Sequence, residues 1–389
     1  MRILLINETA RPHTGGLNRM VVESMDWLRR AGHNVALGYF DRAPSAVPEP
    51  VFSLPPHGVE LVEAARKMIQ EFRPDVIQLH LAWPDFFLNE IHRFVPTCRF
   101  IHDQSWFCSG GDRMSGRYSA CHRPHGVACL FWHYAQRCGG KNPIGNWRRW
   151  NQVERFQSLK RHRTVRIQVA SQFMQQGLIE NDYPESRIDV VPLFAIPARA
   201  KSNPEHGLLL VASRLVKSKG VHVLLDALSR IANLPWTLAI AGEGPERHKL
   251  ESKAAGLGFQ TRVQFLGELT PESLDLWYAR AHIVVSPVLR PEPFGLIGLE
   301  AMAHGKPLIA FAGGATEEWL VHQKTGLVVR DRSATALAQA IATLIENAEA
   351  SVSFGSAAME HWAQFRPEIY IERVTNSFQR AIHDFSAKV

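Results

Sequence analysis

Two glutamates stand on either side of a predicted helix start in the stretch Arg290-Pro-Glu-Pro-Phe-Gly-Leu-Ile-Gly-Leu-Glu-Ala-Met-Ala-His-Gly-Lys-Pro307. Pro293 suits the first position of a helix, and the later glycine and proline supply a stop. Free backbone amides and the helix dipole favour an anion at such a start. The amides concerned belong to Phe294, Gly295 and Leu296.

The spacing of the two glutamates fits a nucleoside diphosphate. Glu300 lies seven residues beyond Pro293, which is about 10 Å along a helix axis. A diphosphate at the helix start would place a ribose beside Glu300. Glu292 would then lie on the other side of the phosphates, within reach of a sugar's hydroxyls. The same stretch is also compatible with a capped helix that carries two surface glutamates.

Two cations follow the apolar run Leu208–Ala212, in a predicted turn from strand to helix. Arg214 would bind a diphosphate through two parallel N–H bonds of its guanidinium group, and Lys219 would act as a point charge. Gly242 follows the next apolar run and permits close approach of a ligand to the backbone. Each of these patterns, taken singly, is also typical of an ordinary turn.

The first half of the chain offers a smaller set of candidates. Gly15 and Gly16 follow the first apolar run and precede a predicted helix, where paired glycines let a substrate approach the backbone. His102 follows another apolar run and is followed directly by Asp103. A glycine pair is usually a turn, and a lone histidine is more often structural than catalytic.

Strands and helices that alternate along the chain would position these residues. The predicted strands form two series: Ile3–Ile6, Asn34–Tyr39, Val76–Leu79 and Arg99–His102, then Leu208–Ala212, Trp236–Ala241, Val263–Leu266, Ile283–Ser286, Pro307–Phe311 and Gly326–Val329. Predicted helices between them include Gly16–Ala31, Val59–Phe72, Val221–Ile231 and Leu296–Ala303. Such alternation is typical of α/β proteins with parallel sheets and crossover helices.

The stretch Pro192–Asn203, which lacks apolar periodicity, separates the two series. We therefore expect two doubly wound, Rossmann-like domains, at residues 1–200 and 201–366, with a terminal amphipathic helix at residues 367–389. Ligands of open parallel sheets bind beyond the carboxyl ends of the strands. Two facing sheets would place a ligand in the cleft between the domains.

Taken in order, these motifs resemble the retaining glycosyltransferases of family 4. The resemblance covers nearly the whole chain, and its specific part is the pair of glutamates, with Phe-Gly-Leu between them, that starts at Glu292. It implies the GT-B fold, an N-terminal domain that binds the acceptor, a C-terminal domain that binds a nucleotide-diphosphate sugar, and a last helix that returns to the first domain. The residues Asn7-Glu8-Thr9-Ala10 depart from the more apolar loop of many relatives.

The resemblance also implies a role for each candidate residue. Arg214 and Lys219 would bind the diphosphate, Glu292 the hydroxyls of the transferred sugar, and Glu300 the ribose. His102 would touch the sugar or its scissile bond. The remaining contacts with the nucleotide sugar would come from Gly15, Gly16, Gly242, Phe294, Gly295 and Leu296.

The implied reaction moves a hexose from a UDP- or GDP-sugar to a glycan or a lipid-linked acceptor, as in the synthesis of cell-surface polysaccharide or glycolipid. Fixed cations and helix amides would stabilise the leaving diphosphate without a metal cofactor. No enzymic nucleophile stands out, so attack on the same face of the sugar is expected. Two alternatives are a sugar-nucleotide 2-epimerase on the same fold and a basic nucleic-acid-binding protein, although no nucleic-acid motif is present.

The net charge of +7 is concentrated in one segment. Eight Lys or Arg residues and one acid lie between Lys141 and Arg166. An anionic membrane surface contacted through residues 144–163 would explain them, and so would a solvated helix face. No apolar run reaches the roughly 18 residues of a membrane span. The run Ile3–Ile6 is too short for a signal peptide, which predicts a cytoplasmic protein, at the inner face of the membrane if the basic segment binds lipid.

Four of the five cysteines follow His102 in one predicted loop: Cys108, Cys121, Cys129 and Cys138. Their spacing lacks a Cys-x-x-Cys pair, which weakens the signal for zinc. Disulfides are disfavoured in the cytoplasm. A structural zinc site, which nearby histidines could join, a set of disulfides and buried free thiols all stay open.

Overall fold

The computed structural model describes residues 1–10, 16–40, 47, 49–55, 59–80, 85–115, 120–140, 142–162 and 164–387. The chain divides into two compact units. The first comprises Met1–Leu193 with Pro367–Val389, and the second comprises Phe194–Arg366. The boundary between the units therefore lies between Leu193 and Phe194. The sequence pattern predicted it a few residues later, after residue 200.

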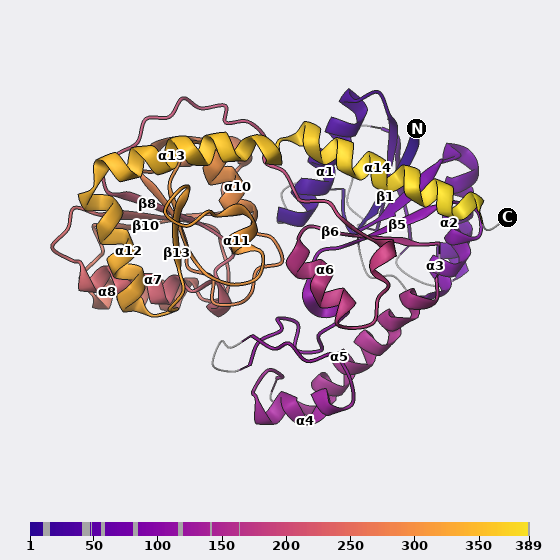
Figure 1. The fold of residues 1–389 in the computed structure, drawn as a ribbon, viewed down its shortest axis with the longest axis horizontal. Coiled ribbons are helices and arrows are strands. Elements are labelled where there is room, and N and C mark those ends of the chain that lie inside the picture. The colour runs from indigo at the N-terminus through magenta and orange to yellow at the C-terminus, as the bar shows by residue number, and fades with distance from the viewer. Residues whose placement is uncertain are drawn as a thin grey trace. The chain divides into compact units, whose positions relative to one another are not determined.

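The first unit is built on a seven-stranded parallel sheet with the strand order β3-β2-β1-β4-β5-β6-β7 (Figure 1). Its strands are β1 (Arg2–Asn7), β2 (Asn34–Tyr39), β3 (Val51–Ser53), β4 (Val76–Leu79), β5 (Thr97–Ile101), β6 (Arg166–Val169) and β7 (Ile188–Val190). Its helices are α1 (Gly16–Arg30), α2 (Val59–Phe72), α3 (Asp85–His92), α4 (Ala128–Ala135), α5 (Pro143–Phe156), α6 (Gln172–Ile179) and α14 (Pro367–Ser386), with the 3-10 turns η1 (Gln104–Trp106), η2 (Gln157–Arg161) and η3 (Glu185–Arg187).

Burial of the sheet on both faces explains the apolar strands. The residues from Ile3 to Ile6 in β1 are fully buried, as expected where helices cover both sides of a parallel sheet. Helix α14 packs against α1, β4, β5 and β6, and it buries one stripe of Tyr370, Val374, Phe378 and Ala381. Its amphipathic pattern in the sequence thus serves this packing.

Three strands of this sheet escape prediction from the sequence. Strand β3 has only three residues, while β6 and β7 carry polar side chains inside the protein. Arg166, Gln168 and Asp189 are at most 8% exposed, so these two strands do not form apolar runs. In the basic segment, helix α5 ends at Phe156 and the 3-10 turn η2 follows it.

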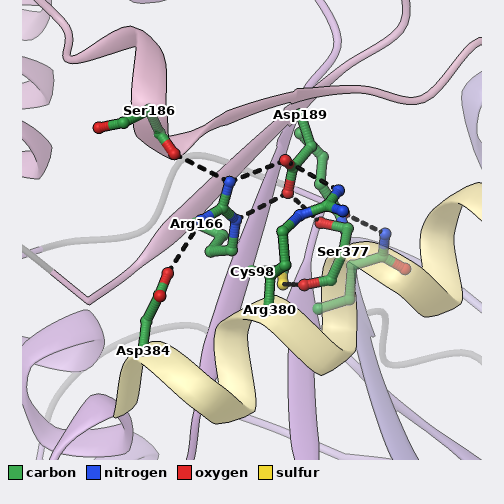
Figure 2. A network of polar contacts seen from close by, with 9 residues as sticks. Cys98, Arg166, Ser186, Asp189, Ser377, Arg380 and Asp384 are labelled. Carbon is green, nitrogen blue, oxygen red and sulfur yellow. Dashed lines mark hydrogen bonds and ion pairs between the residues drawn. The ribbon is translucent and has the colours of Figure 1, made fainter. Parts of the chain in front are cut away.

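A buried polar network ties α14 to β6 and β7 (Figure 2). Asp189 accepts two hydrogen bonds of 2.8 Å from Arg166 and one of 2.6 Å from Ser377. Arg380 lies 3.0 Å from the same carboxylate, and Asp384 accepts a 2.9 Å bond from Arg166. Burial opposes ionisation of Asp189, but these donors outweigh it and hold its pKa below the usual value. The network fixes the register of the helix on the sheet.

The second unit is built on a six-stranded parallel sheet with the order β10-β9-β8-β11-β12-β13 (Figure 1). Its strands are β8 (Leu208–Ala212), β9 (Thr237–Ala241), β10 (Val263–Gly267), β11 (Ile283–Ser286), β12 (Leu308–Phe311) and β13 (Gly326–Val329). Its helices are α7 (Val221–Arg230), α8 (Arg247–Gly256), α9 (Pro271–Arg280), α10 (Leu296–Ala303), α11 (Thr316–Trp319), α12 (Ala334–Glu346) and α13 (Ala348–Trp362), with the 3-10 turns η4 (Lys217–Lys219) and η5 (Ala363–Phe365). The predicted α/β class with two doubly wound parallel sheets is confirmed.

Candidate active site

Lys219 and Glu292 form an ion pair in the second unit. The Lys219 Nζ lies 2.7 Å from the Glu292 Oε1, and both side chains are largely buried. The Nε of Arg290 lies 3.7 Å from the same oxygen. Burial by itself raises the pKa of Glu292, but Lys219 and then Arg290 outweigh it and hold the pKa below its usual value. The carboxylate is therefore ionised and flanked by two cations.

The turn after β8 holds Lys219 in place. Gly220 has a φ of 72°, and a Cβ there would overlap the carbonyl oxygen of Pro287, so glycine is required on both counts. The amide of Leu289 donates a 2.9 Å bond to the carbonyl of Ser218. The turn that carries the lysine is thereby fastened to the segment that leads from β11 to the glutamate.

A glycine also fixes the backbone of Glu292. This residue forms a parallel bridge with Gly314, and its carbonyl accepts a 2.9 Å bond from the amide of Ala315. Gly314 has a φ of 64°, and a Cβ on it would overlap the Glu292 backbone. The glycine pair Gly313-Gly314 therefore has a packing role, because it lets the loop after β12 approach the glutamate.

Helix α10 spans Leu296–Ala303, as predicted, and Pro293, which suits a first helical position, lies before it. Gly295 precedes the helix with a φ of 107°, a backbone conformation that few residues other than glycine adopt. The indole of Trp319 donates a 2.6 Å bond to the Phe294 carbonyl and packs against Gly295. As the first helical residue, Leu296 has an amide without an acceptor inside the helix.

Glu300 lies in the second turn of α10, roughly 6 Å of helix rise beyond its first residue. One of its carboxylate oxygens accepts a 2.7 Å bond from the hydroxyl of Tyr278 in α9. The Tyr278 ring stacks on His304 with centroids 5.0 Å apart, and His304 Nε2 lies 2.8 Å from Asp275 Oδ1. The glutamate that we expected at the ribose is therefore oriented by neighbours from α9.

Arg214 and Gly242 follow neighbouring strands of the second sheet. Arg214 is exposed, and within the described part of the chain no hydrogen bond or ion pair holds its side chain. Gly242 has a φ of 130°, and a Cβ on it would overlap the carbonyl oxygen of Ser213. It is therefore the residue that lets the ends of β8 and β9 lie close together.

His102 lies in the first unit, in a stack of three rings. Its ring is 4.4 Å from that of Phe100 and 5.3 Å from that of His80. The His80 Nδ1 lies 3.0 Å from the His102 Nε2. Burial, and next to it the charge of Arg99, lowers the pKa of His80 to about 3, and burial followed by His80 lowers the pKa of His102. Both imidazoles are neutral near pH 7.

Of the predicted glycine pair, Gly16 is the first residue of α1 and is exposed, while Gly15 lies outside the described residues. The second unit thus brings Lys219 and Glu292 together beside the start of a short helix. Cations and free amides at one place can neutralise a leaving phosphate, and an ionised carboxylate can orient sugar hydroxyls.

Two family models together match most of the chain. The model described as Glycosyltransferase Family 4 matches residues 14–199, and the model described as Glycosyl transferases group 1 matches residues 195–361. The chain belongs to glycosyltransferase family 4.

Curated relatives align with about half of this family 4 chain. It is 34% identical over 172 residues to the GDP-mannose-dependent alpha-(1-6)-phosphatidylinositol monomannoside mannosyltransferase of Mycobacterium tuberculosis, an alignment that covers 42% of this chain and 44% of that protein. It is 30% identical over 185 residues to the lipopolysaccharide core biosynthesis mannosyltransferase LpcC of Rhizobium leguminosarum, covering 46% and 50%. The chain thus spans half or less of the length of these two relatives.

Solved structures match over almost the full length. The crystal structure of Anabaena HepE in complex with UDP superimposes with a TM-score of 0.69 at 22% identity, covering 97% of this chain and 100% of that one. At such identity the likeness establishes the fold alone. It confirms the GT-B fold class, with two Rossmann-like units, that the motifs of family 4 imply.

Several residues around the family 4 motifs were not predicted from the sequence. Tyr278, Trp319 and His80 contact Glu300, Phe294 and His102, respectively. None belongs to a short motif, and each lies far along the chain from its partner or in another element. His80 carries a weak signal, since it follows β4 as His102 follows β5.

The predicted cysteine loop occupies the connection from β5 to β6. All five cysteines are free thiols. In the described ranges, no group of three or more His, Cys, Asp or Glu side chains is set at metal-ligating positions. Burial, and then the charges of the other three thiols, raise the pKa of Cys138 to about 11.

The basic segment forms α5 and η2, and its two ends differ in burial. Val153 and Phe156 are buried in the first unit, whereas Ile144 and Trp147 are more than half exposed. Three further apolar side chains of the same region are also more than half exposed, namely Val127, Phe131 and Tyr134. Among the helices that the structure describes, none has the length and apolar character of a membrane span.

Proposed function

We propose that the protein is a hexosyltransferase that moves a sugar from a nucleotide-diphosphate sugar to a glycan or a lipid-linked acceptor. The ion pair between Lys219 and Glu292 beside the start of α10 carries this proposal, because it joins a phosphate-binding cation to a sugar-binding carboxylate. Two relatives are named as mannosyltransferases of lipid and lipopolysaccharide synthesis. We therefore place the reaction in the assembly of cell-surface glycolipid or polysaccharide.

Departure of the diphosphate is the step that the second unit serves. As the bond between the anomeric carbon and the phosphate oxygen breaks, negative charge grows on the leaving group. Lys219 lies ready to take up that charge, and the unpaired guanidinium of Arg214 is available as a second cation. One fixed donor of this kind lowers the barrier by about 3–4 kcal/mol. We expect transfer to continue in buffer freed of Mg²⁺ and Mn²⁺.

The sugar centre would become oxocarbenium-like while the acceptor oxygen attacks. Glu292 is ionised and held between Lys219 and Arg290, which suits it to orient hydroxyls of the sugar rather than to attack the anomeric carbon. We infer attack on the face from which the diphosphate leaves, with retention of configuration. Proton NMR of the first product formed would show the anomeric configuration directly.

A thermal-shift series with UDP, GDP, ADP and their hexose conjugates tests the donor assignment. A ligand at 100 times its Kd should add about 2.7 kcal/mol to the stability of the unit that binds it. A selective shift by one nucleotide identifies the base, and UDP and GDP are the two expected candidates. Lys219→Ala should reduce that shift, whereas a shift by none of these compounds would contradict the proposal.

We further propose that the exposed apolar face of α4 and α5 rests on an anionic membrane, on the cytoplasmic side. The face consists of Val127, Phe131, Tyr134, Ile144 and Trp147, and the exposed Arg148, Arg149 and Arg155 lie on the same helix α5. Apolar insertion combined with nearby cations is the pattern of an interfacial helix. It would bring the protein to a lipid-linked acceptor.

Liposome sedimentation at physiological salt tests this contact. The protein should sediment with vesicles that contain anionic lipid and much less with neutral vesicles. Trp147→Glu should abolish sedimentation, whereas Val352→Glu, at an exposed apolar position of α13 in the second unit, should leave it unchanged. If the unaltered protein fails to sediment, the membrane contact is refuted.

A further inference from the structure

Glu300 is held at both its side chain and its main chain by one pair of stacked rings. The Tyr278 hydroxyl donates a 2.7 Å bond to the Glu300 Oε2. The His304 Nδ1 donates a 2.8 Å bond to the Glu300 carbonyl, because a carbonyl oxygen can only accept. The two rings stack with centroids 5.0 Å apart and planes that differ by 24°. These contacts form a closed loop that begins and ends at Glu300.

Burial and further hydrogen bonds fix this pair of rings. Tyr278 is 1% exposed and His304 is 7% exposed. The His304 Nε2 lies 2.8 Å from the Asp275 Oδ1 in α9. Asp275 also accepts bonds of 3.1 and 2.7 Å from the amides of Arg199 and Ala200, in the segment that precedes β8. Neither ring can therefore turn without breaking contacts to other elements of the second unit.

The fixed rings determine the direction of the Glu300 carboxylate before any ligand binds. A glutamate side chain has three rotatable bonds, and it loses this freedom when a ligand orders it. The bond from Tyr278 orders Glu300 in the free protein, so a ligand that binds the carboxylate need not do so. Because a carboxylate is planar, the position of Oε2 also sets the direction of Oε1.

The place of this carboxylate suits the ribose of a nucleotide. Helix α10 begins at Leu296, beside the ion pair of Lys219 and Glu292, where we propose that the diphosphate binds. Glu300 lies roughly 6 Å of helix rise farther along α10. In a nucleotide the ribose is joined directly to the diphosphate, and its neighbouring 2′ and 3′ hydroxyls can both donate. A carboxylate accepts such bonds strongly because it is charged.

We propose that Tyr278 is a positioning residue through which the protein selects nucleotides with an intact ribose diol. Tyr278 is too deeply buried to meet the ligand, so it acts by fixing Glu300, which receives the ribose hydroxyls. His304 acts one step farther away, because its ring keeps the Tyr278 ring in place. This role rests on the nucleotide-sugar donor proposed above, and it names the part of that donor that is recognised.

Calorimetric titration of the full-length protein tests this role. The probes are UDP, GDP and the 2′-deoxy and 3′-deoxy analogue of whichever binds. The unaltered protein should bind the ribonucleotide about 10 to 100 times more tightly than at least one analogue, because the missing hydroxyl removes a hydrogen bond to a charged group. Equal affinities for the ribonucleotide and both analogues would overturn the proposal.

Tyr278→Phe keeps the aromatic ring and removes only the hydroxyl. This variant should bind the ribonucleotide about three to ten times more weakly, since the ligand must now order the Glu300 side chain. Its affinity for the deoxy analogue should stay the same. General damage to the second unit would weaken both affinities, so their ratio separates positioning from loss of structure. An unchanged ratio in Tyr278→Phe would contradict the role of Tyr278.

Two further variants complete the test. Tyr183→Phe is the matched control, because Tyr183 is a buried tyrosine of the first unit whose hydroxyl donates a 3.0 Å bond to the Phe156 carbonyl. It should leave both affinities unchanged. His304→Gln keeps an N–H for Asp275 but loses the stacked ring, and it should lower the same ratio. If the unaltered protein binds neither UDP nor GDP, the proposed function fails and this role fails with it.

Discussion

At the scale of single residues, the ion pair between Lys219 and Glu292 shows how one contact serves two tasks. The carboxylate keeps the lysine ordered in the free protein, and the lysine keeps the carboxylate ionised. When the phosphate of a bound donor replaces Glu292 as the partner of Lys219, the ammonium group is already in position. Such preorganisation avoids a reorganisation cost in the transition state.

Lys219→Ala should therefore lower kcat by about 100- to 1000-fold, the usual effect of removing one preorganised donor. Glu292 is largely buried and keeps Arg290 as its remaining cation in this variant, so the thermal midpoint should also fall, and the kinetics are measured well below it. Lys217→Ala is the matched control, since Lys217 is an exposed lysine of the same turn. Steady-state kinetics with both variants would show the difference, and full activity in Lys219→Ala would remove the phosphate assignment.

The neutral pair His80 and His102 makes stability depend on pH. An unfolded histidine takes up a proton below about pH 6.5, whereas burial and Arg99 keep His80 neutral down to about pH 3. The unfolded state thus binds more protons within this window. The contribution of His80 is present in full above about pH 6.5 and is lost as the pH falls toward 3.

Urea unfolding at a series of pH values measures this effect. Between about pH 6.5 and 3, the free energy of unfolding should fall less steeply for His80→Gln than for the unaltered protein, and His102 accounts for part of the remaining slope. His248→Gln, at an exposed position of α8, should leave the profile unchanged. Identical slopes for His80→Gln and the unaltered protein would show that His80 protonates freely in the folded state.

At the scale of elements, the attachment of α14 to the first sheet depends on buried polar groups. Asp189 joins Arg166 of β6 to Ser377 and Arg380 of the helix. Loss of this carboxylate would leave the Arg166 guanidinium buried without its main partner. A buried charge left in that way is costly, whereas the loss of an exposed partner is cheap.

Asp189→Asn should therefore destabilise the first unit by about 3–5 kcal/mol. Asp384→Asn removes a half-exposed carboxylate from the same arginine and should cost about 1 kcal/mol or less. Because Asp189 has a lowered pKa, its contribution is present above about pH 4 and is lost at lower pH. Denaturant unfolding of both variants at pH 7 would rank them, and equal costs would contradict the asymmetry.

The same elements show which features the sequence makes predictable. Strands such as β1 and β8 are continuous apolar runs, so burial on both faces marks them clearly. Strands β6 and β7 contain Arg166, Gln168 and Asp189, whose burial depends on partners in α14 about 200 residues away. The local pattern of apolar residues gives no information about partners that lie so far along the chain. Pro293 suits a first helical position but does not begin α10, because Gly295 has a positive φ and the helix starts only after it, at Leu296.

The candidate site shows the same division. The residues that form short motifs, such as Lys219, Glu292 and Glu300, are found from types and spacing alone. Their supporting partners Tyr278 and Trp319 come from other elements and have no motif of their own. The fold class was predictable because the alternation of strands and helices repeats along the chain.

At the scale of the whole molecule, the second unit is one continuous stretch, whereas the first requires both ends of the chain. A chain that stops after Arg366 lacks α14 and exposes the face that Tyr370, Val374 and Phe378 cover. We expect its first unit to lose cooperative unfolding while the second still shows the nucleotide thermal shift.

Pulse proteolysis with mass spectrometry would test the truncation, and cleavage should concentrate before Leu193. A chain that ends at Ser386 keeps the whole of α14 and should resist the protease as the full-length protein does. Resistance of the chain that stops after Arg366 would show that the first sheet is stable without its last helix.

The late position of α14 has a consequence during translation. When Leu193 has left the ribosome, the first sheet must wait roughly 10–40 s for the rest of the chain at ordinary rates of synthesis. The face of the first sheet that α14 later covers is not purely apolar during this time. It carries the polar side chains of Gln78, Arg166, Gln168 and Asp189. Polar groups of this kind act as gatekeepers against aggregation. The network that later fastens the helix thereby also protects the nascent chain before the helix exists.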